Sequence, residues 1–412
     1  MVLPRRPTVH LVSVGDELLN GRTVDTNAAH LARILTDRGL RVLRTTVTGD
    51  GLEGIVAALA AETADLVLVT GGLGPTDDDR TREAVARHLG VALVEDPAAW
   101  RAIRARWRRL RPGQEPSPSN RRQALVPVGG EALANDRGTA PGLLARHGHT
   151  WIACLPGVPH EMRAMADRLV RRLPRLLPRL PEVRVAELYL AGIGESALQE
   201  LLPGQFDSLD PQLGVTVSEA GHLVLRAVGS PAAVRAKMAA LRRVVAPWRL
   251  PAPGIAPSLV QHLTRAGLTI TTAESCTVGL VAAALGAVPG ASAVLREALV
   301  AYAPEVKARR LGVPAAGLRH VVSQACVEAM ARGARRRTGA DLAVATTGIA
   351  GPGGGTAEVP SGTVWIAVAG PKGVQARMLR IDGDRGRVQH RAAAEALLQA
   401  WHMIINEWPA TD

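Results

Sequence analysis

The chain has 412 residues, of which 47% are hydrophobic and 21% charged, so it has enough apolar material for roughly two to four globular domains and is not a largely disordered protein. Basic residues outnumber acidic ones by 12, but only three of the 49 basic residues are lysines, so the excess reflects a general use of arginine and is weak evidence for nucleic-acid binding. Three widely separated cysteines exclude a disulfide framework or a CxxC zinc site and indicate a reducing compartment, so a cytoplasmic location is expected.

The first third of the sequence alternates predicted strands and helices. Strands are expected at 9–14, 41–48 and 65–70, and helices at 26–38, 51–64 and 81–90. This alternation predicts a parallel sheet with helices on both faces. Such sheets bind ligands at the carboxyl ends of their strands, where the glycine-rich segment 71–79 is expected to lie.

The remaining sequence predicts a small α+β unit, a proline-rich linker and a second α/β domain. Segment 275–295 is too rich in glycine for a membrane span and is read as a buried helix followed by a turn. The arginines of 101–111 have near-helical spacing, which favours a solvated helix face over a nucleic-acid surface. The predicted fold class is therefore two doubly wound α/β domains joined by a small α+β domain and a linker, with boundaries at 1–172, 173–247, 248–257 and 258–412.

A glycine-rich turn at 71–74 follows a buried strand and precedes a helix. Glycines allow backbone N–H groups to approach a phosphate closely. Three aspartates at 77–79 come directly afterwards and would repel a phosphate unless a cation lay between them, which favours Mg²⁺ or a similar hard cation. A run of capping residues at a helix start explains the aspartates equally well.

Polar residues also follow the other strands of this region. Asp16 and Glu17 follow the first strand, Asp50 follows the second, and Asp25 and Asn27 open the first helix. Because the carboxyl ends of parallel strands meet at one edge of a sheet, these side chains are expected to share a site with the aspartate run.

Four segments carry a family resemblance: 15–27 (GDELLNGRTVDTN), 71–81 (GGLGPTDDDRT), 135–142 (NDRGTAPG) and 155–162 (LPGVPHEM). In this order they resemble the molybdopterin-binding-like domain, with a MogA- and MoaB-like fold, that opens CinA proteins. The resemblance implies hydrolysis of ADP-ribose to AMP and ribose 5-phosphate, with Mg²⁺ or a similar divalent cation and K⁺ as a further candidate. It implies that Asp50 and Asp79 are catalytic and hold the metal. The substrate-binding residues expected here are Asp16, Glu17, Asn27, Gly71, Gly72, Gly74 and Thr139.

Ser275 lies where a predicted strand meets a helix. A nucleophile at such a junction is exposed and lies near backbone N–H donors. A serine at a helix start is more often a cap, and this position alone favours the cap. The adjacent Cys276 is the next candidate nucleophile, because cysteines also attack amides.

Lys307 is one of three lysines and lies five residues after Tyr302, one of two tyrosines. A buried lysine can lose its proton, whereas arginine effectively cannot. A Ser–Lys pair assisted by a tyrosine can therefore activate a hydroxyl without histidine. The alternative is a surface lysine without a special role.

The segment 346–356 (TTGIAGPGGGT) holds five glycines after a buried strand. It lacks the Gly-Lys-Ser/Thr of a P-loop and is not a GxGxxG turn before a helix. A cradle for a phosphate or an oxyanion and a long flexible loop both fit this composition.

Segments 273–279, 288–294, 301–307, 346–356 and 383–385 together resemble the C-terminal domain of CinA proteins, a nicotinamide mononucleotide (NMN) deamidase. The resemblance implies that Ser275 attacks the carboxamide carbon while Lys307, aided by Tyr302, handles the proton, giving nicotinate mononucleotide and ammonia without a metal or other cofactor. The substrate-binding residues implied here are Thr277, Thr347, Gly348, Gly351, Gly353 and Arg385.

The sequence departs from the family pattern beside this site. Val278 stands where glycine is usual, Ala303 and Pro304 replace Ser-Asn, and Ser361 stands where valine is commoner. The bulkier, β-branched valine is expected to crowd the substrate or alter the start of the helix. The proposed nucleophile, tyrosine and lysine are all kept.

The middle unit resembles the KH-like insert of CinA proteins but lacks the GxxG loop that clamps nucleic acid. We therefore expect this unit to have a structural or dimerisation role and the chain not to bind nucleic acid. We also expect a homodimer that does not bind membranes. The small-molecule partners that the family resemblance implies are NMN and ADP-ribose. Two alternatives stay open: a competence or DNA-damage accessory protein that acts through partner binding, and a molybdopterin-processing enzyme.

Overall fold

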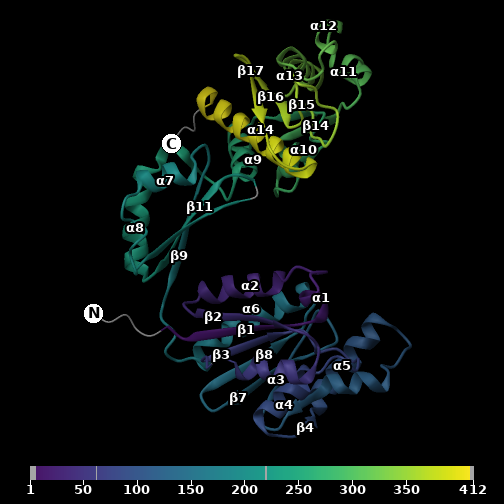
Figure 1. Ribbon diagram of the computed structural model, residues 1–412, viewed down its shortest axis with the longest axis vertical. Coiled ribbons are helices and arrows are strands. Elements are labelled where there is room, and N and C mark those ends of the chain that lie inside the picture. Colours follow the sequence, from purple (N-terminus) through teal and green to yellow (C-terminus); the bar gives the residue numbers. More distant parts are fainter. Residues whose placement is uncertain (1–5, 62, 219, 409–412) are drawn as a thin grey trace. The chain divides into compact units, whose positions relative to one another are not determined.

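The computed structural model describes residues 6–61, 63–218 and 220–408. The chain divides into two compact units, Met1–Val185 with Val228–Ala232, and Ala186–Ala227 with Ala233–Asp412. The helices and strands of both units are labelled in Figure 1. Each unit has its own hydrophobic core.

The first unit is built on a six-stranded sheet with the order β2-β1-β3-β8-β7-β6. Its strands are β1 (Thr8–Val14), β2 (Arg41–Thr48), β3 (Leu66–Thr70), β6 (Glu131–Leu133), β7 (Gly142–His147) and β8 (Thr150–Leu155). Its helices are α1 (Asp16–Leu19), α2 (Thr26–Thr36), α3 (Leu52–Ala60), α4 (Thr81–Leu89), α5 (Pro97–Leu110) and α6 (Pro159–Leu176). The strands β4 (Leu93–Glu95) and β5 (Leu125–Pro127) form a separate pair.

Only part of this sheet is parallel. Strands β2, β1 and β3 run parallel to one another as predicted, and β8 is parallel to them. Strand β7 pairs antiparallel with both β8 and β6. The two-residue turn Gly148–His149 joins β7 to β8, and so short a turn permits only antiparallel pairing.

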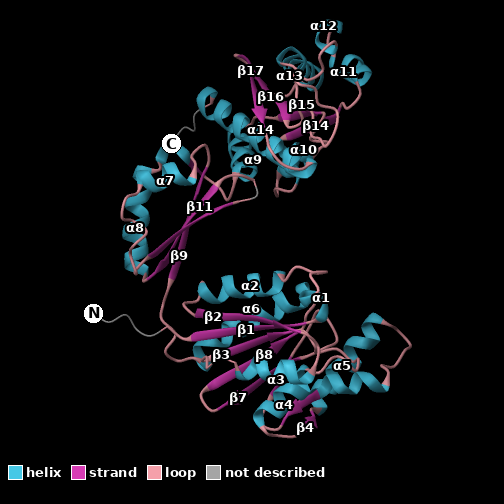
Figure 2. Ribbon diagram, in the orientation of Figure 1, coloured by secondary structure: helices cyan, strands magenta, loops and turns pink. Residues whose placement is uncertain are grey.

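Helices cover both faces of the sheet (Figure 2). Leu31 of α2 and Met162 of α6 pack in one core, while Ile55 of α3 and Val85 of α4 pack in another. Side chains of a strand alternate between its faces, so β1 contributes to both cores. The predicted doubly wound architecture is therefore present.

A small four-stranded sheet follows, with the order β10-β11-β9-β12. It comprises β9 (Arg184–Leu190), β10 (Gln212–Val217), β11 (Leu223–Gly229) and β12 (Arg249–Leu250), with the helices α7 (Glu195–Leu201) and α8 (Pro231–Val244). A leucine-rich core joins these helices to the sheet. The predicted small α+β unit thus forms.

The C-terminal domain has a five-stranded sheet with the order β14-β13-β15-β16-β17. Its strands are β13 (Ile270–Glu274), β14 (Leu295–Val300), β15 (Leu342–Gly348), β16 (Thr363–Gly370) and β17 (Gly373–Arg380). Its helices are α9 (Ile255–Ala266), α10 (Leu280–Gly286), α11 (Pro304–Leu311), α12 (Ala315–Leu318), α13 (Gln324–Thr338) and α14 (Arg385–Glu407). Strands β14, β13 and β15 run parallel to one another. Strand β16 pairs antiparallel with both β15 and β17.

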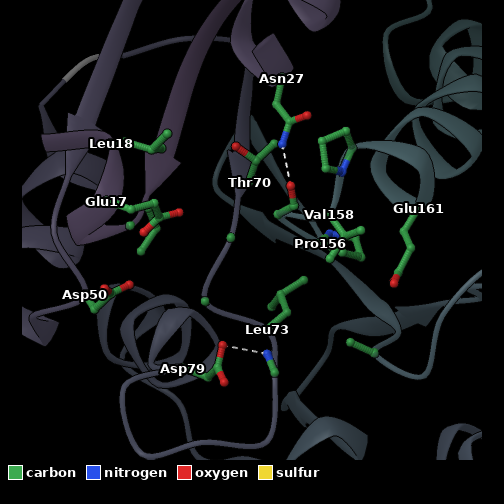
Figure 3. Close-up of a pocket in the computed structure, with 18 of the residues that line it drawn as sticks. Glu17, Leu18, Asn27, Asp50, Thr70, Leu73, Asp79, Pro156, Val158 and Glu161 are labelled. Carbon is green, nitrogen blue, oxygen red and sulfur yellow. Dashed lines mark hydrogen bonds between the residues drawn. The ribbon is translucent and has the colours of Figure 1, made fainter. Parts of the chain in front are cut away.

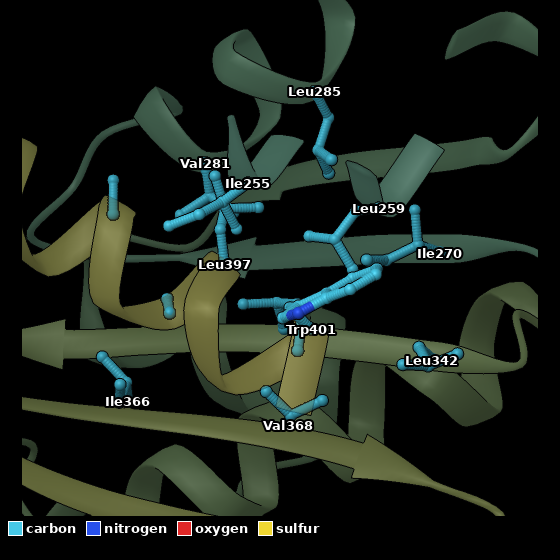
Figure 4. Close-up of a cluster of buried hydrophobic side chains, with 14 of the residues drawn as sticks. Ile255, Leu259, Ile270, Val281, Leu285, Leu342, Ile366, Val368, Leu397 and Trp401 are labelled. Atoms are coloured by element: carbon cyan, nitrogen blue, oxygen red, sulfur yellow. The ribbon is translucent and has the colours of Figure 1, made fainter. Parts of the chain in front are cut away.

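The largest core lies on one face of this sheet. Leu259 of α9, Val281 of α10, and Leu397 and Trp401 of α14 pack there (Figure 4). A second core involving α11 and α13 lies on the other face. The carboxyl ends of β13 and β15 are thereby held in a rigid domain.

Two predicted boundaries differ from the structure. Residues 249–250 of the predicted linker form β12, which pairs with β9, and α9 begins at Ile255 rather than at 258. Helix α6 continues past the predicted boundary at 172 to Leu176, although Pro174 inside it removes one backbone N–H donor, and the neighbouring Leu173 is buried in the core of the first unit. The small α+β unit is grouped mainly with the C-terminal domain.

Within the described ranges, none of the helices has the length and apolar character needed to cross a membrane. Segment 275–295 forms the seven-residue helix α10 and a following turn, as predicted.

Candidate functional site

A pocket of about 630 Å³ lies in the first unit, where β1, β2, β3 and β8 end (Figure 3). The predicted residues that line it are Glu17, Asn27, Asp50, Gly71, Gly72, Gly74, Asp79 and Thr139. Asp16 does not line the pocket. Its backbone N–H donates a hydrogen bond to Oδ2 of Asp50 at 3.1 Å and so helps to orient the carboxylate of Asp50. The structure therefore brings the ends of four strands to one site.

The glycine-rich loop is held by Asp79. Oδ1 of Asp79 accepts a hydrogen bond from the N–H of Gly74 at 2.7 Å, and Oδ2 accepts one from the N–H of Thr76 at 3.0 Å. A Cβ atom at Gly74 would overlap this carboxylate, which explains the glycine. Asp79 is thus both a brace of the loop and part of the pocket wall.

Helix α4 ties the same loop to its surroundings from beneath. The hydroxyl of Thr81 donates to the carbonyl of Gly71 at 2.8 Å. The guanidinium of Arg82, which is 5% exposed, donates to the carbonyls of Leu73 and Pro141, both at 2.7 Å. Burial lowers the pKa of Arg82 to about 10, so it stays charged at neutral pH.

Asp50 lies among other acids. Burial raises the pKa of Asp50 above its ordinary value, and repulsion from Asp16, Glu17 and Asp78 adds to the increase, while the hydrogen bond from the N–H of Asp16 opposes it. A carboxylate in such surroundings is stabilised by a nearby cation.

The pocket chemistry fits a hard cation. The side chains that line it include carboxylates but neither lysine nor arginine; these acids are Glu17, Asp25, Asp50, Asp78, Asp79 and Glu161. Across the described part of the chain, no three His, Cys, Asp or Glu side chains lie close enough to form a complete metal site. Mg²⁺ is commonly held by one or two carboxylates together with substrate phosphates, so Asp50 and Asp79 suit such a partial site.

Sequence reasoning missed Glu161 and Asn135 as site residues. Glu161 lies in the first turn of α6 and lines the pocket, and its Oε2 accepts a hydrogen bond from Nδ2 of Asn135 at 2.7 Å. Both residues lie within quoted motifs, 155–162 and 135–142. A carboxylate four residues after the proline-glycine pair that follows a strand was the available signal.

The second site lies at the carboxyl end of β13 in the C-terminal domain. Ser275 directly follows this strand, and its N–H donates to the carbonyl of Thr346 at 3.0 Å. Ser275 does not cap α10, which begins at Leu280. The buried carboxylate of Glu274 takes that role, because it accepts from the N–H groups of Gly279, Val281 and Ala282 at 2.9–3.1 Å.

The side chain of Lys307 meets Ser275. Its Nζ lies 3.0 Å from Oγ of Ser275, 2.8 Å from the carbonyl oxygen of Ala301 and 2.7 Å from that of Tyr302. Lys307 is 2% exposed, and burial lowers its pKa below 10.5. In the neutral amine, two hydrogens can point at the carbonyls while the lone pair faces the serine hydroxyl.

Tyr302 contributes its backbone carbonyl to Lys307, while its side chain is 56% exposed. Nη2 of Arg385 lies 3.4 Å from the hydroxyl oxygen of Tyr302. Nη1 of the same arginine donates to the carbonyl of Gly351 at 3.0 Å. Arg385 opens α14, so a cation, a phenol and the glycine-rich loop lie together, and the backbone of Tyr302 connects them to Lys307.

Three residues predicted to bind substrate, Thr277, Thr347 and Gly348, make close contacts within the domain. The hydroxyl of Thr277 is buried and bonds Glu274 and Thr346, both at 2.7 Å. Thr347 is 1% exposed and donates to the carbonyl of Val321. Gly348 ends β15, where a Cβ would collide with the backbone of β16. Burial raises the pKa of Cys276 to about 12, so it is not a thiolate nucleophile.

The loop after β15 and the turn after β13 contain further residues that the sequence analysis named. Gly353 lies in the exposed part of the loop after β15, and Gly351 packs so closely on the hydroxyl of Ser361 that a Cβ would not fit. Val278 has a φ of 50°, a left-handed conformation that is unfavourable for a β-branched residue, and it is 49% exposed.

Comparisons with known proteins identify the family of both α/β domains. Residues 10–179 match the probable molybdopterin binding domain, and residues 254–404 match the CinA C-terminal domain. A CinA-like protein of Gemmatimonas aurantiaca is 39% identical over 409 residues, with 94% of each chain covered. A CinA-like protein of Anaeromyxobacter sp. (strain K) is 41% identical over 404 residues, covering 94% of this chain and 98% of the relative.

Among solved structures, the protein CinA with unknown function from Thermoplasma acidophilum is 37% identical, with a TM-score of 0.38, and covers 40% of this chain and 98% of that one. The matches to whole-length relatives decide the assignment, because they run through both α/β domains and the unit between them. This chain belongs to the CinA family.

Proposed function

We propose that the chain is a bifunctional hydrolase of nicotinamide nucleotides and their breakdown products. Its C-terminal domain would convert NMN and water to nicotinate mononucleotide and ammonia. The observation that supports this most is the 3.0 Å contact between Nζ of Lys307 and Oγ of Ser275 in a buried setting. A serine and a neutral lysine suffice for attack on an amide.

In this reaction, Oγ of Ser275 attacks the carboxamide carbon and its proton passes to Nζ of Lys307. The tetrahedral intermediate collapses, the carbon–nitrogen bond breaks, and Lys307 returns the proton to the leaving ammonia. Water then attacks the acyl-serine and gives a proton to Lys307; the bond between the acyl carbon and Oγ of Ser275 breaks, Lys307 returns the proton to Oγ, and the carboxylate product leaves. Arg385, which donates to the carbonyl of Gly351, would bind the phosphate together with this loop.

The N-terminal pocket would hydrolyse the pyrophosphate of ADP-ribose to AMP and ribose 5-phosphate. A divalent cation held by Asp50 and Asp79 would neutralise phosphoryl charge and lower the pKa of a bound water. The support is that six carboxylates and a glycine-rich loop share one pocket. The loop allows its backbone to approach a phosphate, and Asp79 fixes its shape.

One set of assays tests both activities. Purified protein is incubated with NMN or ADP-ribose, with and without a chelator, and ammonia and AMP are measured. We expect Ser275→Ala to abolish ammonia release and to spare AMP formation, and Asp50→Asn to do the reverse. The chelator should stop only AMP formation. Full deamidation by Ser275→Ala would reject the nucleophile assignment, and AMP formation unaffected by the chelator would reject the metal.

A further inference from the structure

Glu161 is an acidic residue in the wall of the N-terminal pocket and comes from a different element than Asp50. Figure 3 shows Glu161 on one side of the view and Asp50 on the other, with Leu73, Pro156 and Val158 of the lining drawn between them. Asp79 braces the glycine-rich loop, whereas Glu161 comes from α6 after β8. The pocket therefore carries carboxylates on two different elements of its wall, and a cation held by Asp50 and Asp79 does not account for Glu161.

Glu161 is held in place from one side only. Nδ2 of Asn135 donates to its Oε2 at 2.7 Å and to the carbonyl of Ala140 at 2.9 Å. Oδ1 of Asn135 accepts from the N–H groups of Arg137 and Gly138, so the orientation of this amide is fixed. A Cβ at Gly138 would overlap the carboxylate, so the loop backbone is in contact with it.

The other carboxylate oxygen is free to accept a hydrogen bond. Among the residues that the structure describes, Oε1 of Glu161 receives no hydrogen bond and no arginine or lysine pairs with the side chain. Asn27 lies in the same lining; its Nδ2 donates to the carbonyl of Gly157 at 2.7 Å, and its Oδ1 is buried without a hydrogen-bond partner. This part of the wall offers acceptors and requires donors from a ligand.

A ribose ring supplies such donors. Its vicinal hydroxyls can both donate to one carboxylate, as in dinucleotide-binding folds where an acidic residue binds the ribose 2′-hydroxyl. A phosphate, by contrast, is repelled by Glu161 and suits the glycine-rich end. We propose that Glu161 binds the ribose diol of the nucleotide and sets the preference for ribo- over deoxyribonucleotides. This assignment rests on the proposed N-terminal activity for its ligand class, because it takes AMP as the product of that site.

Binding of AMP, 2′-deoxy-AMP, 3′-deoxy-AMP and IMP is measured by calorimetry with Mg²⁺, for the full-length protein and for Glu161→Gln. The wild type should bind AMP about tenfold or more tightly than either deoxy analogue, since hydrogen bonds to charged groups are worth at least that much. Glu161→Gln should reduce this ratio to nearly one, mainly by weakening AMP. The matched control is Glu53→Gln, an exposed glutamate paired with Arg87, which should keep the wild-type ratio.

A purely structural role predicts another pattern. If Glu161 only stabilised the first turn of α6 and the Asn135 loop, Glu161→Gln would weaken AMP and both deoxy analogues equally, which would overturn the proposal. A lost preference for AMP over IMP, with the deoxy ratio kept, would assign Glu161 to the base and also overturn it. Wild-type protein that fails to bind AMP would overturn it as well.

The outcome for the proposed reaction is read separately. Protein that discriminates riboses through Glu161 but does not hydrolyse ADP-ribose would refute the reaction and keep the binding role. Protein that hydrolyses ADP-ribose, with a deoxy ratio unaffected by Glu161→Gln, would refute the binding role alone. Asn135→Ala supplies a second variant, which should lower the ratio only in part because it frees Glu161 without removing it.

Discussion

The carboxylate Oε2 of Glu274 accepts a hydrogen bond from the hydroxyl of Thr277 at 2.7 Å. Together with its backbone contacts at the start of α10, this bond makes Glu274 the cap of the helix. Ser275 is thereby left without a capping role, and its hydroxyl is available to Lys307. The buried Glu274 thus leaves the adjacent Ser275 free for its proposed role as a nucleophile.

Replacing Glu274 by glutamine is expected to destabilise the C-terminal domain by about 2 kcal/mol, because an amide cannot accept every hydrogen bond that the carboxylate accepts. Deamidation should fall as the turn that carries Ser275 loosens. Urea denaturation and NMN turnover measure both effects. Glu297→Gln, which removes a partly exposed partner of Arg337, should change neither by a comparable amount.

Lys307→Met is expected to reduce NMN deamidation by roughly 10²–10⁴-fold, because it keeps most of the side-chain volume and removes the base. Lys307→Arg should not restore activity, since arginine stays protonated. AMP release from ADP-ribose should remain at the wild-type level in both variants. Lys372→Met in the exposed turn before β17 is the control, and an equal loss of activity there would contradict a specific role for Lys307.

The pH dependence of deamidation should report the lowered pKa of Lys307. Burial favours the neutral amine, so the active fraction grows as pH rises through the folded-state pKa, and kcat/KM should level off below pH 10.5. Between these two pKa values the unfolded chain binds more protons than the folded one, so wild-type stability should rise with pH relative to Lys307→Met. A rising limb centred at the ordinary lysine pKa would contradict a buried base.

Arg82→Met should lower the free energy of unfolding of the N-terminal domain by about 2–4 kcal/mol, because the carbonyls of Leu73 and Pro141 lose their donors. The pocket loops should loosen as well, so AMP formation should fall while deamidation persists. Thermal denaturation and the two activity assays test this. Arg87→Met, on the exposed side of the same helix, should have little effect on either.

Val278→Gly is expected to raise the free energy of unfolding by about 1 kcal/mol, since it removes the strain of a left-handed valine and gives up little burial at a half-exposed position. Val278→Ala keeps a Cβ and should therefore show little or no gain. Denaturation curves compare the three proteins. A gain of the same size in the alanine variant would show that side-chain bulk, rather than φ, causes the strain.

The sequence alone determined the two α/β domains, the small unit between them and the family. These follow from local signals: alternating apolar strands and amphipathic helices, glycine-rich turns after strands, and motifs in a fixed order. Ser275 and Lys307 were also found by sequence, because a retained lysine is conspicuous in a chain that uses arginine almost everywhere.

Tertiary structure decided the contacts. Only the fold shows that Glu274 caps α10, that Thr277 and Thr347 face inward, that Tyr302 meets Lys307 through its carbonyl, and that Glu161 reaches the N-terminal pocket. These facts depend on which segments, far apart in the chain, become neighbours, and on which side chains the packing buries. The spacing of residues in a motif indicates which side chains could react or bind. The hydrogen bonds between segments that are distant in the sequence determine which atoms those side chains contact.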